Sequence, residues 1–302
     1  MCAGKMHADE VHTDVTLVRG LLTTQFPQWA ELRIEPVVSS GTDNALYRLG
    51  DDMVVRLPRI HWAVEMVDKE HEWLPTLAPH LPLSIPVPLA KGMPGEGYPW
   101  HWSVNPWFEG NDTTVEPIAD LRRAALELAE FIADLQRIDP SGGPFPGTHN
   151  VFRGVPLAAR DAQTRKAIDE LVGVIDTGAA IAVWESALQA PVWERPLWIH
   201  GDIDPRNLLV QRGHLRAVID WGCLGVGDPA YDLTAAWRLF SGESRDAFRS
   251  ALAFDDATWA RARGLVVSMA AGLAYYTDTN PALVSMVRRG IDEVLTEHKR
   301  DA

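Results

Sequence analysis

The segment from Trp198 to Leu224 constrains the fold most strongly, because short apolar strands alternate there with polar turns. Residues 200–210 have the sequence HGDIDPRNLLV, and residues 218–222 have the sequence VIDWG. Their apolar parts predict the two strands of a hairpin, which would bring Asn207 and Asp220 to the same end. One amide oxygen and one carboxylate suit Mg²⁺, because this hard cation takes few protein ligands and completes its shell with phosphate and water.

The first of these motifs is His-x-Asp with an Asn five residues after the Asp. The second is an Asp at the end of an apolar strand. The combination resembles the catalytic core of the protein-kinase-like superfamily. It resembles the aminoglycoside phosphotransferase family more closely, since it matches that family's His-Gly-Asp-x-x-x-x-Asn and Ile-Asp-Trp/Phe motifs. Residues 227–233, GDPAYDL, are similar to the Gly-Asp-Pro-x-x-Asp-Leu segment of the same family. The resemblance extends from about Val37 to about Trp237.

That resemblance implies an α+β, two-lobed protein-kinase-like fold, with a β-rich N-terminal lobe and a mostly helical C-terminal lobe. It implies that Asp202 is the catalytic base or orients the hydroxyl, and that His200 supports the catalytic loop. Asn207 would act in catalysis and, with Asp220, would hold Mg²⁺. Phosphoryl transfer does depend on positioning and charge neutralisation more than on a covalent nucleophile. Turn formation would explain one such residue alone, but it does not explain the linked set.

The implied reaction moves the γ-phosphoryl group of ATP or GTP to a hydroxyl of a small molecule. Candidate acceptors in the family are aminoglycoside and macrolide antibiotics, sugars and amino alcohols. One alternative is a non-catalytic, kinase-like nucleotide-binding protein, against which the complete set of Asp202, Asn207 and Asp220 argues. A second alternative is a protein kinase. Protein serine/threonine kinases usually have Lys at the position of Asp204, and no Ala-Pro-Glu segment follows residues 220–222, so this alternative is disfavoured.

The hydrophobic pattern predicts a β-rich N-terminal part and a helix-rich C-terminal part. We expect an N-terminal nucleotide-binding lobe at 1–107, a hinge at about 104–110 and a C-terminal catalytic and acceptor-binding lobe at 108–302. The chemistry would lie in the cleft between the lobes, since ligand sites favour such interfaces. Helices are predicted at Val11–Gln25, Trp62–Ala78, Ile118–Ile138 and Leu157–Leu188, the last with a break near Thr177 and Gly178. Strands are predicted at Leu32–Val38, Ala45–Leu49, Met53–Leu57 and Trp100–Phe108.

The N-terminal part contains two candidate phosphate-binding features. Residues 39–44, SSGTDN, lie between predicted strands and are similar to the phosphate-covering loop of these enzymes, which makes Ser40, Gly41 and Asn44 candidate contacts. An ordinary turn is the alternative. Arg56 occupies the strand position that usually presents a Lys to the α- and β-phosphates, and it keeps the charge as a planar fork.

The usual partner of that cation is a Glu on the following helix. Glu70 is the expected partner, with Glu65 as the alternative one turn earlier. Segment 104–110 resembles the hinge that binds the base through backbone groups, so Asn105 and Trp107 are expected to contact the nucleotide. Pro106 removes one of the available donors.

Three further residues have two interpretations each. Arg206 would either supply a cation near the transferred phosphate or pair with Asp204. Asp228 precedes a proline at a predicted helix start, which is typical of an N-cap. Asp228 and Asp232 are interpreted mainly as structural, although either would also suit a cationic acceptor.

The composition excludes some functions. The net charge is −13 without a run of Lys or Arg, which disfavours a nucleic-acid partner. A cationic or neutral acceptor fits this charge better, although acidity also promotes solubility. Cys2 and Cys223 form no disulfide framework, and the N-terminus has no signal-peptide pattern, so we expect a cytoplasmic protein. No apolar stretch reaches the roughly 20 residues of a membrane span. The sequence indicates no oligomeric state.

Overall fold

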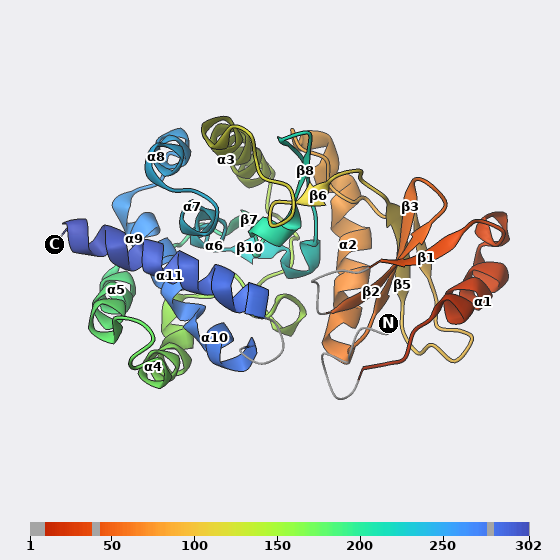
Figure 1. Ribbon diagram of the computed structural model, residues 1–302, viewed down its shortest axis with the longest axis horizontal. Helices are drawn as coiled ribbons and strands as arrows, with labels where there is room; N and C mark the ends of the chain where they lie inside the picture. The colour runs from red at the N-terminus through yellow and green to blue at the C-terminus, as the bar shows by residue number, and fades with distance from the viewer. Residues whose placement is uncertain (1–9, 38–42, 277–280, 302) are drawn as a thin grey trace.

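The computed structural model describes residues 10–37, 43–276 and 281–301, with only the backbone described at 274–276, 281–282 and 301. Two bodies lie side by side along the long axis of the molecule (Figure 1). The N-terminal body is built on a β-sheet, and the C-terminal body consists mainly of helices (Figure 1). This arrangement confirms the predicted α+β fold class.

The N-terminal body contains a five-stranded antiparallel sheet in the order β1-β2-β3-β5-β4. Its strands are β1 (Ile34–Val37), β2 (Asn44–Leu49), β3 (Met53–Pro58), β4 (Ala90–Gly92) and β5 (Trp102–Pro106). Half-buried and buried residues alternate along β2, as expected for a strand with one face on a core. Helix α1 (Val15–Gln25) covers the outer face, and α2 (Val64–Leu77) covers the face toward the C-terminal body (Figure 1). The Asp14 side chain caps α1 by accepting from Leu17 N at 2.7 Å.

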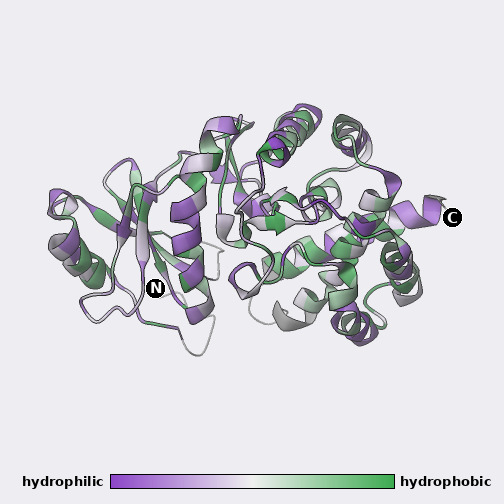
Figure 2. Ribbon diagram, turned by 180° about the vertical axis from the view of Figure 1, so that it is seen from behind, coloured by the Kyte–Doolittle hydropathy of each residue, from purple (hydrophilic) through white to green (hydrophobic). Residues whose placement is uncertain are grey.

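Helix α2 packs against both bodies, although it precedes the predicted boundary. Figure 2 shows that it is largely hydrophilic, yet Lys69 and Glu70 are buried. Lys69 Nζ donates to Gly222 O at 2.8 Å. Trp73 packs on Trp198 with ring centroids 4.9 Å apart, and Leu74 belongs to the larger core of the C-terminal body. Helix α2 is therefore a shared element, which was not predicted from its place in the sequence.

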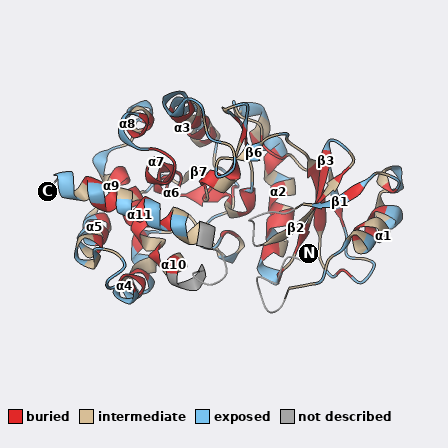
Figure 3. Ribbon diagram, in the orientation of Figure 1, coloured by how far each residue is buried: buried red, intermediate tan, exposed pale blue. Residues whose placement is uncertain are grey.

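The C-terminal body surrounds two small sheets with helices (Figure 1). Its helices are α3 (Leu121–Arg137), α4 (Asp161–Glu170), α5 (Thr177–Gln189), α6 (Ala230–Leu233), α7 (Ala235–Arg238), α8 (Gly242–Ala251), α9 (Asp256–Ser268), α10 (Ala270–Tyr276) and α11 (Pro281–Asp301). The sheets are β6 (Asn111–Asp112) with β8 (Leu208–Gln211) and β9 (His214–Val218), and β7 (Leu197–Ile199) with β10 (Gly225–Gly227). Helices α6 and α7 are buried at the centre (Figure 3).

The chain leaves the first sheet at Pro106 and joins the second at Asn111, next to β8. We propose that the boundary between the two lobes lies between residues 107 and 108, within this connecting segment. The region predicted to be helical at Leu157–Leu188 does contain a break, but the break lies at 171–176, just before the predicted position near Thr177 and Gly178. The turn at 171–176 ends α4, and the Asp176 side chain caps α5 by accepting from Ala179 N at 3.0 Å.

Helix α11 is fixed by one buried carboxylate. Glu297 accepts from Trp237 Nε1 at 2.8 Å, from Arg263 Nη1 at 3.0 Å and from Arg245 Nη1 at 3.1 Å. Burial disfavours its ionised form, but these hydrogen bonds and charges outweigh burial and lower the pKa of Glu297. In the part of the chain that the structure describes, no helix has both the length and the apolar character needed to cross a membrane.

Candidate active site

The predicted catalytic loop begins where β7 ends. Asp232 is fully buried, and its two carboxylate oxygens accept from the backbone N–H groups of His200 and Gly201, each at 2.8 Å. Burial is the main reason why the pKa of Asp232 is raised, although these hydrogen bonds oppose the shift. Gly201 has φ of +81°, and a Cβ there would lie 2.6 Å from Cys223 O. Glycine is therefore required by both the backbone conformation and the available space.

His200 connects the two halves of the site. Its Nδ1 accepts from Asp202 N at 3.2 Å, and its Nε2 lies 3.0 Å from Ile219 O. The Nε2–H tautomer satisfies both contacts. The ring packs edge-on against Trp221 at 4.7 Å. His200 thus links the loop to the segment before Asp220, and its supporting role in catalysis stays a prediction.

Asp202 is partly exposed, at 23% of its side chain, and faces several cations. Its Oδ1 lies 3.6 Å from Arg238 Nη1 and 3.9 Å from Arg153 Nη2. Burial alone would raise the pKa of the Asp202 carboxyl, but the charges of Arg238, Arg153 and Arg206 outweigh burial and lower that pKa to about 2. The side chain is therefore an ionised hydrogen-bond acceptor at neutral pH.

Asp204 organises the arginines beside Asp202. It is fully buried, and its Oδ2 lies 2.5 Å from Arg206 Nη2 and 2.8 Å from Arg238 Nη2. Its Oδ1 also accepts from Arg206 N at 2.7 Å. Arg206 therefore pairs with Asp204, which was one of the two interpretations drawn from the sequence. A Lys at position 204 would face two guanidinium groups, so the position cannot serve as it does in protein serine/threonine kinases.

Asn207 and Asp220 lie together at the end of the β8–β9 hairpin, where Ile219 N donates to Asn207 O at 2.9 Å. Asn207 Nδ2 donates to Asp202 O at 2.9 Å, which leaves its Oδ1 available as a ligand. Asp220 is half-exposed and adopts a left-handed conformation, with φ of 61° and ψ of 70°. Such a conformation in a non-glycine residue is typical of functional sites.

This donor set fits Mg²⁺, because the cation requires few protein oxygens when phosphates complete its shell. Among the described residues, no group of three or more His, Cys, Asp or Glu side chains is arranged to hold a metal by itself.

Arg56 extends from β3 into the space between the two bodies. Its Nη1 lies 2.7 Å from Glu70 Oε2, and its Nη2 lies 3.4 Å from Asp220 Oδ1. Glu65, the alternative partner, is exposed. Glu70 is therefore the partner of Arg56, and the pair places a positive charge next to the candidate metal ligands.

The other N-terminal candidates have different positions. Asn44 begins β2, whereas Ser40 and Gly41 lie outside the described residues. Asn105 is fully buried in β5, and its side-chain amide has no hydrogen-bond partner. Trp107 N donates to Asp52 O at 2.7 Å, so this N–H is not available to a nucleotide base. The predicted hinge contact at Trp107 would have to use another group.

A model of the phosphotransferase enzyme family matches residues 35–265 of this chain. The chain belongs to this family. The match covers the N-terminal sheet, the catalytic loop and most of the helical core, and it places the protein in a family of small-molecule kinases that transfer phosphate to hydroxyl groups. It confirms the family that the sequence motifs indicated.

Solved structures of similar fold include three phosphotransferases. The GDP and kanamycin complex of APH(2″)-IIIa has a TM-score of 0.69 and 20% identity, over 93% of this chain and 97% of that chain. Macrolide 2′-phosphotransferase MphH from Brachybacterium faecium has a TM-score of 0.60 and 20% identity, over 92% and 98%. The streptomycin–ATP–APH(2″)-IIa complex has a TM-score of 0.58 and 18% identity, over 92% and 99%. No curated protein matches the chain.

Several residues of this phosphotransferase that surround the site were not identified from the sequence. Arg153 and Arg238 face Asp202, and Lys69 Nζ joins α2 to Gly222 O. Burial lowers the pKa of Lys69 to about 8. A charged residue after the apolar run Ala235–Trp237 was a signal for Arg238, because a charge inside a buried helix needs a partner. No comparable pattern distinguished Arg153.

Proposed function

We propose that this phosphotransferase moves the γ-phosphoryl group of ATP or GTP to a hydroxyl of a small molecule, with Asp202 as the residue that orients that hydroxyl. The convergence of Asp202, Asn207 and Asp220 at one end of a hairpin supports this proposal most strongly. A carboxylate that can bind the substrate hydroxyl and two candidate metal ligands therefore lie together. Arg56 adds a positive charge at the same place, because it reaches Asp220 from the other body.

The ionised Asp202 would accept a hydrogen bond from the acceptor hydroxyl and point its oxygen at the phosphorus atom. A carboxylate of such low pKa is a weak base, so its main contribution is orientation. It would take the hydroxyl proton as the new P–O bond forms and the bond from the γ-phosphorus to the departing nucleoside diphosphate breaks. His200 and Asp232 hold the loop that carries Asp202. Arg56 would bind the α- and β-phosphates while Glu70 fixes its side chain.

Asn207 Oδ1 and the Asp220 carboxylate would hold Mg²⁺. When bound, the cation would neutralise charge on the transferred phosphate oxygens. The segment that contains Asn105 would bind the nucleotide base through backbone groups, because the side chain of Asn105 is fully buried. Two of the neighbouring structures contain GDP or ATP, which supports a nucleoside triphosphate as the donor.

Kanamycin, streptomycin and macrolides in the neighbours' descriptions support a hydroxylated small molecule as the acceptor class. An aminoglycoside or a macrolide, and with it a role in antibiotic resistance, is the first candidate to test. A cytoplasmic reaction is part of the proposal, since the sequence has two isolated cysteines and no disulfide framework.

A non-catalytic nucleotide-binding protein is the second candidate, and the replacement of the usual Lys by Arg56 favours it. Turnover distinguishes the two candidates. We would measure nucleoside diphosphate release with Mg²⁺ and ATP or GTP against aminoglycosides, macrolides, sugars and amino alcohols.

Asp202→Ala should abolish release with every productive acceptor while it retains nucleotide binding. Asp169→Ala, at an exposed position on α4, is the matched control and should behave like the wild type. If Asp202→Ala turns over at the wild-type rate, the assigned role is wrong. Nucleotide binding without turnover on any acceptor would favour the non-catalytic candidate.

A further inference from the structure

The carboxylates beside the catalytic loop are already engaged. Asp204 is paired with Arg206 and Arg238, and Asp232 accepts two backbone N–H groups. Asp228 Oδ2 lies 2.7 Å from Arg261 Nε, and both side chains are buried. To pair with any of these three carboxylates, an ammonium group of an acceptor would have to disrupt a buried arrangement, which is strongly unfavourable because it leaves a buried charge without its partner.

Arg153 is presented to Asp202 by a tightly held loop. The buried Asn150 donates to Arg153 O at 2.9 Å and accepts from Gly147 N at 3.1 Å. Arg160 Nη2 donates to the carbonyls of Val151 and Phe152, at 3.1 and 3.3 Å. Both of these residues have φ of 54°, a left-handed conformation that their neighbours must hold in place.

The loop that carries Arg153 packs closely on the catalytic loop. The Arg153 Cβ lies 3.2 Å from the position that a Cβ on Gly201 would occupy. Val151 and Phe152 expose apolar side chains, so they offer no polar group that competes with the guanidinium. Arg153 itself is only partly exposed, and its Nε is buried without a hydrogen-bond partner.

The contact between Arg153 and Asp202 is loose. The distance of 3.9 Å from Nη2 to Oδ1 is near the limit for an ion pair and exceeds a hydrogen bond. A hydroxyl bound to Asp202 would lie about 3 Å from the same carboxylate. Groups on the carbon atoms next to that hydroxyl would then be within reach of the Arg153 guanidinium.

We propose that Arg153 is a specificity-determining residue that binds an anionic group, such as a carboxylate, beside the hydroxyl of the acceptor. This inference rests on the proposed function, because it takes Asp202 as the residue that orients the hydroxyl. This inference narrows the proposed acceptor class to a hydroxy acid, in place of the cationic aminoglycosides that the neighbouring structures suggest, despite the net charge of −13. The local charges next to the reacting group decide the selectivity, and the overall charge does not.

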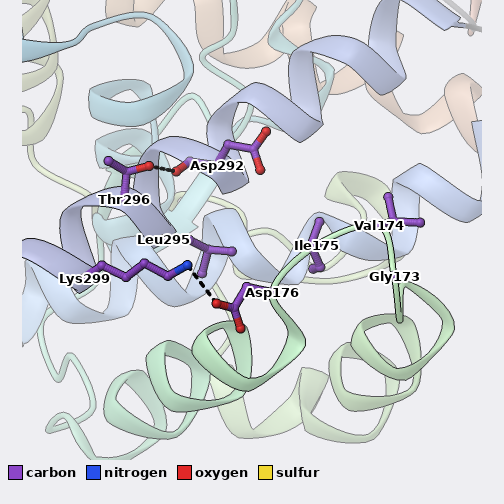
Figure 4. A pocket seen from close by; sticks show the side chains of 8 residues that line it. All are labelled: Gly173, Val174, Ile175, Asp176, Asp292, Leu295, Thr296 and Lys299. Carbon is purple, nitrogen blue, oxygen red and sulfur yellow. Dashed lines mark hydrogen bonds and ion pairs between the residues drawn. The ribbon is translucent and has the colours of Figure 1, made fainter.

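Two cavities in the described part of the molecule lie away from this site. One of about 410 Å³ is lined by the α4–α5 connection and by α11, where Lys299 Nζ lies 2.8 Å from Asp176 Oδ2 (Figure 4). The other is a groove between α3 and α8. Their linings include none of the residues assigned to the active site.

The test uses two polyhydroxylated probes of opposite charge, gluconate and kanamycin. Their affinities are measured by isothermal titration calorimetry, with saturating Mg²⁺·ADP or Mg²⁺·GDP and again without nucleotide. We expect the wild type to bind gluconate more tightly than kanamycin. Arg153→Glu should lower the affinity for gluconate by at least about tenfold and raise the affinity for kanamycin by a similar factor, because it reverses the local charge. Arg153→Lys should retain the wild-type order.

Arg300→Glu, which makes the same charge change at the exposed end of α11, is the control and should leave both affinities unchanged. If Arg153→Glu does not fold, Arg153→Gln is tested in its place. Arg153→Gln should lower the affinity for gluconate and leave the affinity for kanamycin unchanged. The proposal would be overturned if the wild type bound kanamycin more tightly than gluconate or did not bind gluconate. It would also be overturned if the ratio of the two dissociation constants were the same in the wild type and in the charge-changing variant. Failure to bind either nucleotide would instead count against the proposed function, and the titrations without nucleotide would still decide the role of Arg153.

Discussion

The guanidinium of Arg56 lies 2.7 Å from the carboxylate of Glu70, an ion pair in which the Glu70 side chain is only 2% exposed. The same guanidinium reaches Asp220 Oδ1 at 3.4 Å. Burial alone would lower the pKa of Arg56, but the charges of Glu70 and Asp220 outweigh it and raise that pKa. One charged group thus joins the N-terminal sheet, helix α2 and the candidate metal site.

Removal of Glu70 should therefore weaken nucleotide binding. In Glu70→Ala, Arg56 loses its closest partner and is free to move toward Asp220, so we expect the Kd for Mg²⁺·triphosphate to rise by about tenfold. Calorimetric titration measures this change. Glu65→Ala, at an exposed position one turn away on the same helix, is the control and should shift Kd less than about twofold. Equal effects of the two variants would remove Glu70 from the site.

The pH dependence of the rate should reflect the low pKa of Asp202. Because burial is outweighed by Arg238, Arg153 and Arg206, the carboxyl titrates at about 2 and is ionised throughout the range from pH 4 to 8. We therefore expect no acidic fall in kcat from this group above about pH 3. Arg238→Met removes one of the cations, so its pH profile should show a fall at a higher pH than in the wild type. Coincident profiles would show that Arg238 does not set the charge state of Asp202.

Gly201→Ala should damage both stability and catalysis. A Cβ at this position lies 2.6 Å from Cys223 O and requires φ of +81°, so we expect a loss of about 2–4 kcal/mol in the free energy of unfolding and a displaced Asp202. Urea unfolding and kcat give the two readouts. Gly272→Ala in α10 meets no atom within 4 Å, so it should be neutral or stabilise by up to about 1 kcal/mol. A stable and fully active Gly201→Ala enzyme would contradict the loop geometry.

Glu297 should contribute to stability in a pH-dependent way. Its folded pKa is lowered because hydrogen bonds and arginine charges outweigh burial. The stabilisation is then present above the unfolded pKa of about 4.3 and is lost as the pH falls through the lower folded value. At pH 7, Glu297→Gln should cost about 3 kcal/mol in urea unfolding, and the difference from the wild type should shrink between pH 5 and pH 3.

Glu293→Gln is the comparison for that measurement. Glu293 is about one-third exposed and pairs with Arg245, so its loss should cost no more than about 1 kcal/mol. A cost at Glu297 that does not vary with pH would mean that its charge is not the source of the stabilisation.

Local patterns were sufficient to predict the hairpin of the active site. The apolar runs around the turn at Arg212 and Gly213 indicated β8 and β9, and the length of the turn brought Asn207 and Asp220 together. The sequence also predicted the pairing of Arg56 with a glutamate, but the choice between Glu65 and Glu70 depended on which side of α2 faces the sheet. The structure decides that choice through burial.

Contacts between distant segments could not be predicted in the same way. Asp232 binds the backbone of His200 from 32 residues away, and Arg153 approaches Asp202 from a loop without a recognisable motif. Such contacts depend on how helices and loops pack, and neither hydrophobic periodicity nor residue spacing encodes that packing directly. The positively charged surroundings of Asp202 could therefore be recognised only from the three-dimensional structure.

Helix α2 has a consequence for how this enzyme can move. Lys69, Trp73 and Leu74 attach the helix to the C-terminal body, while Glu70 attaches it to the sheet. A rigid-body rotation of the sheet about residues 107–110 would have to pull against these contacts or carry α2 along. Small-angle X-ray scattering should therefore show nearly the same radius of gyration with and without nucleotide, so that substrate entry would depend on loop rearrangement rather than on domain opening.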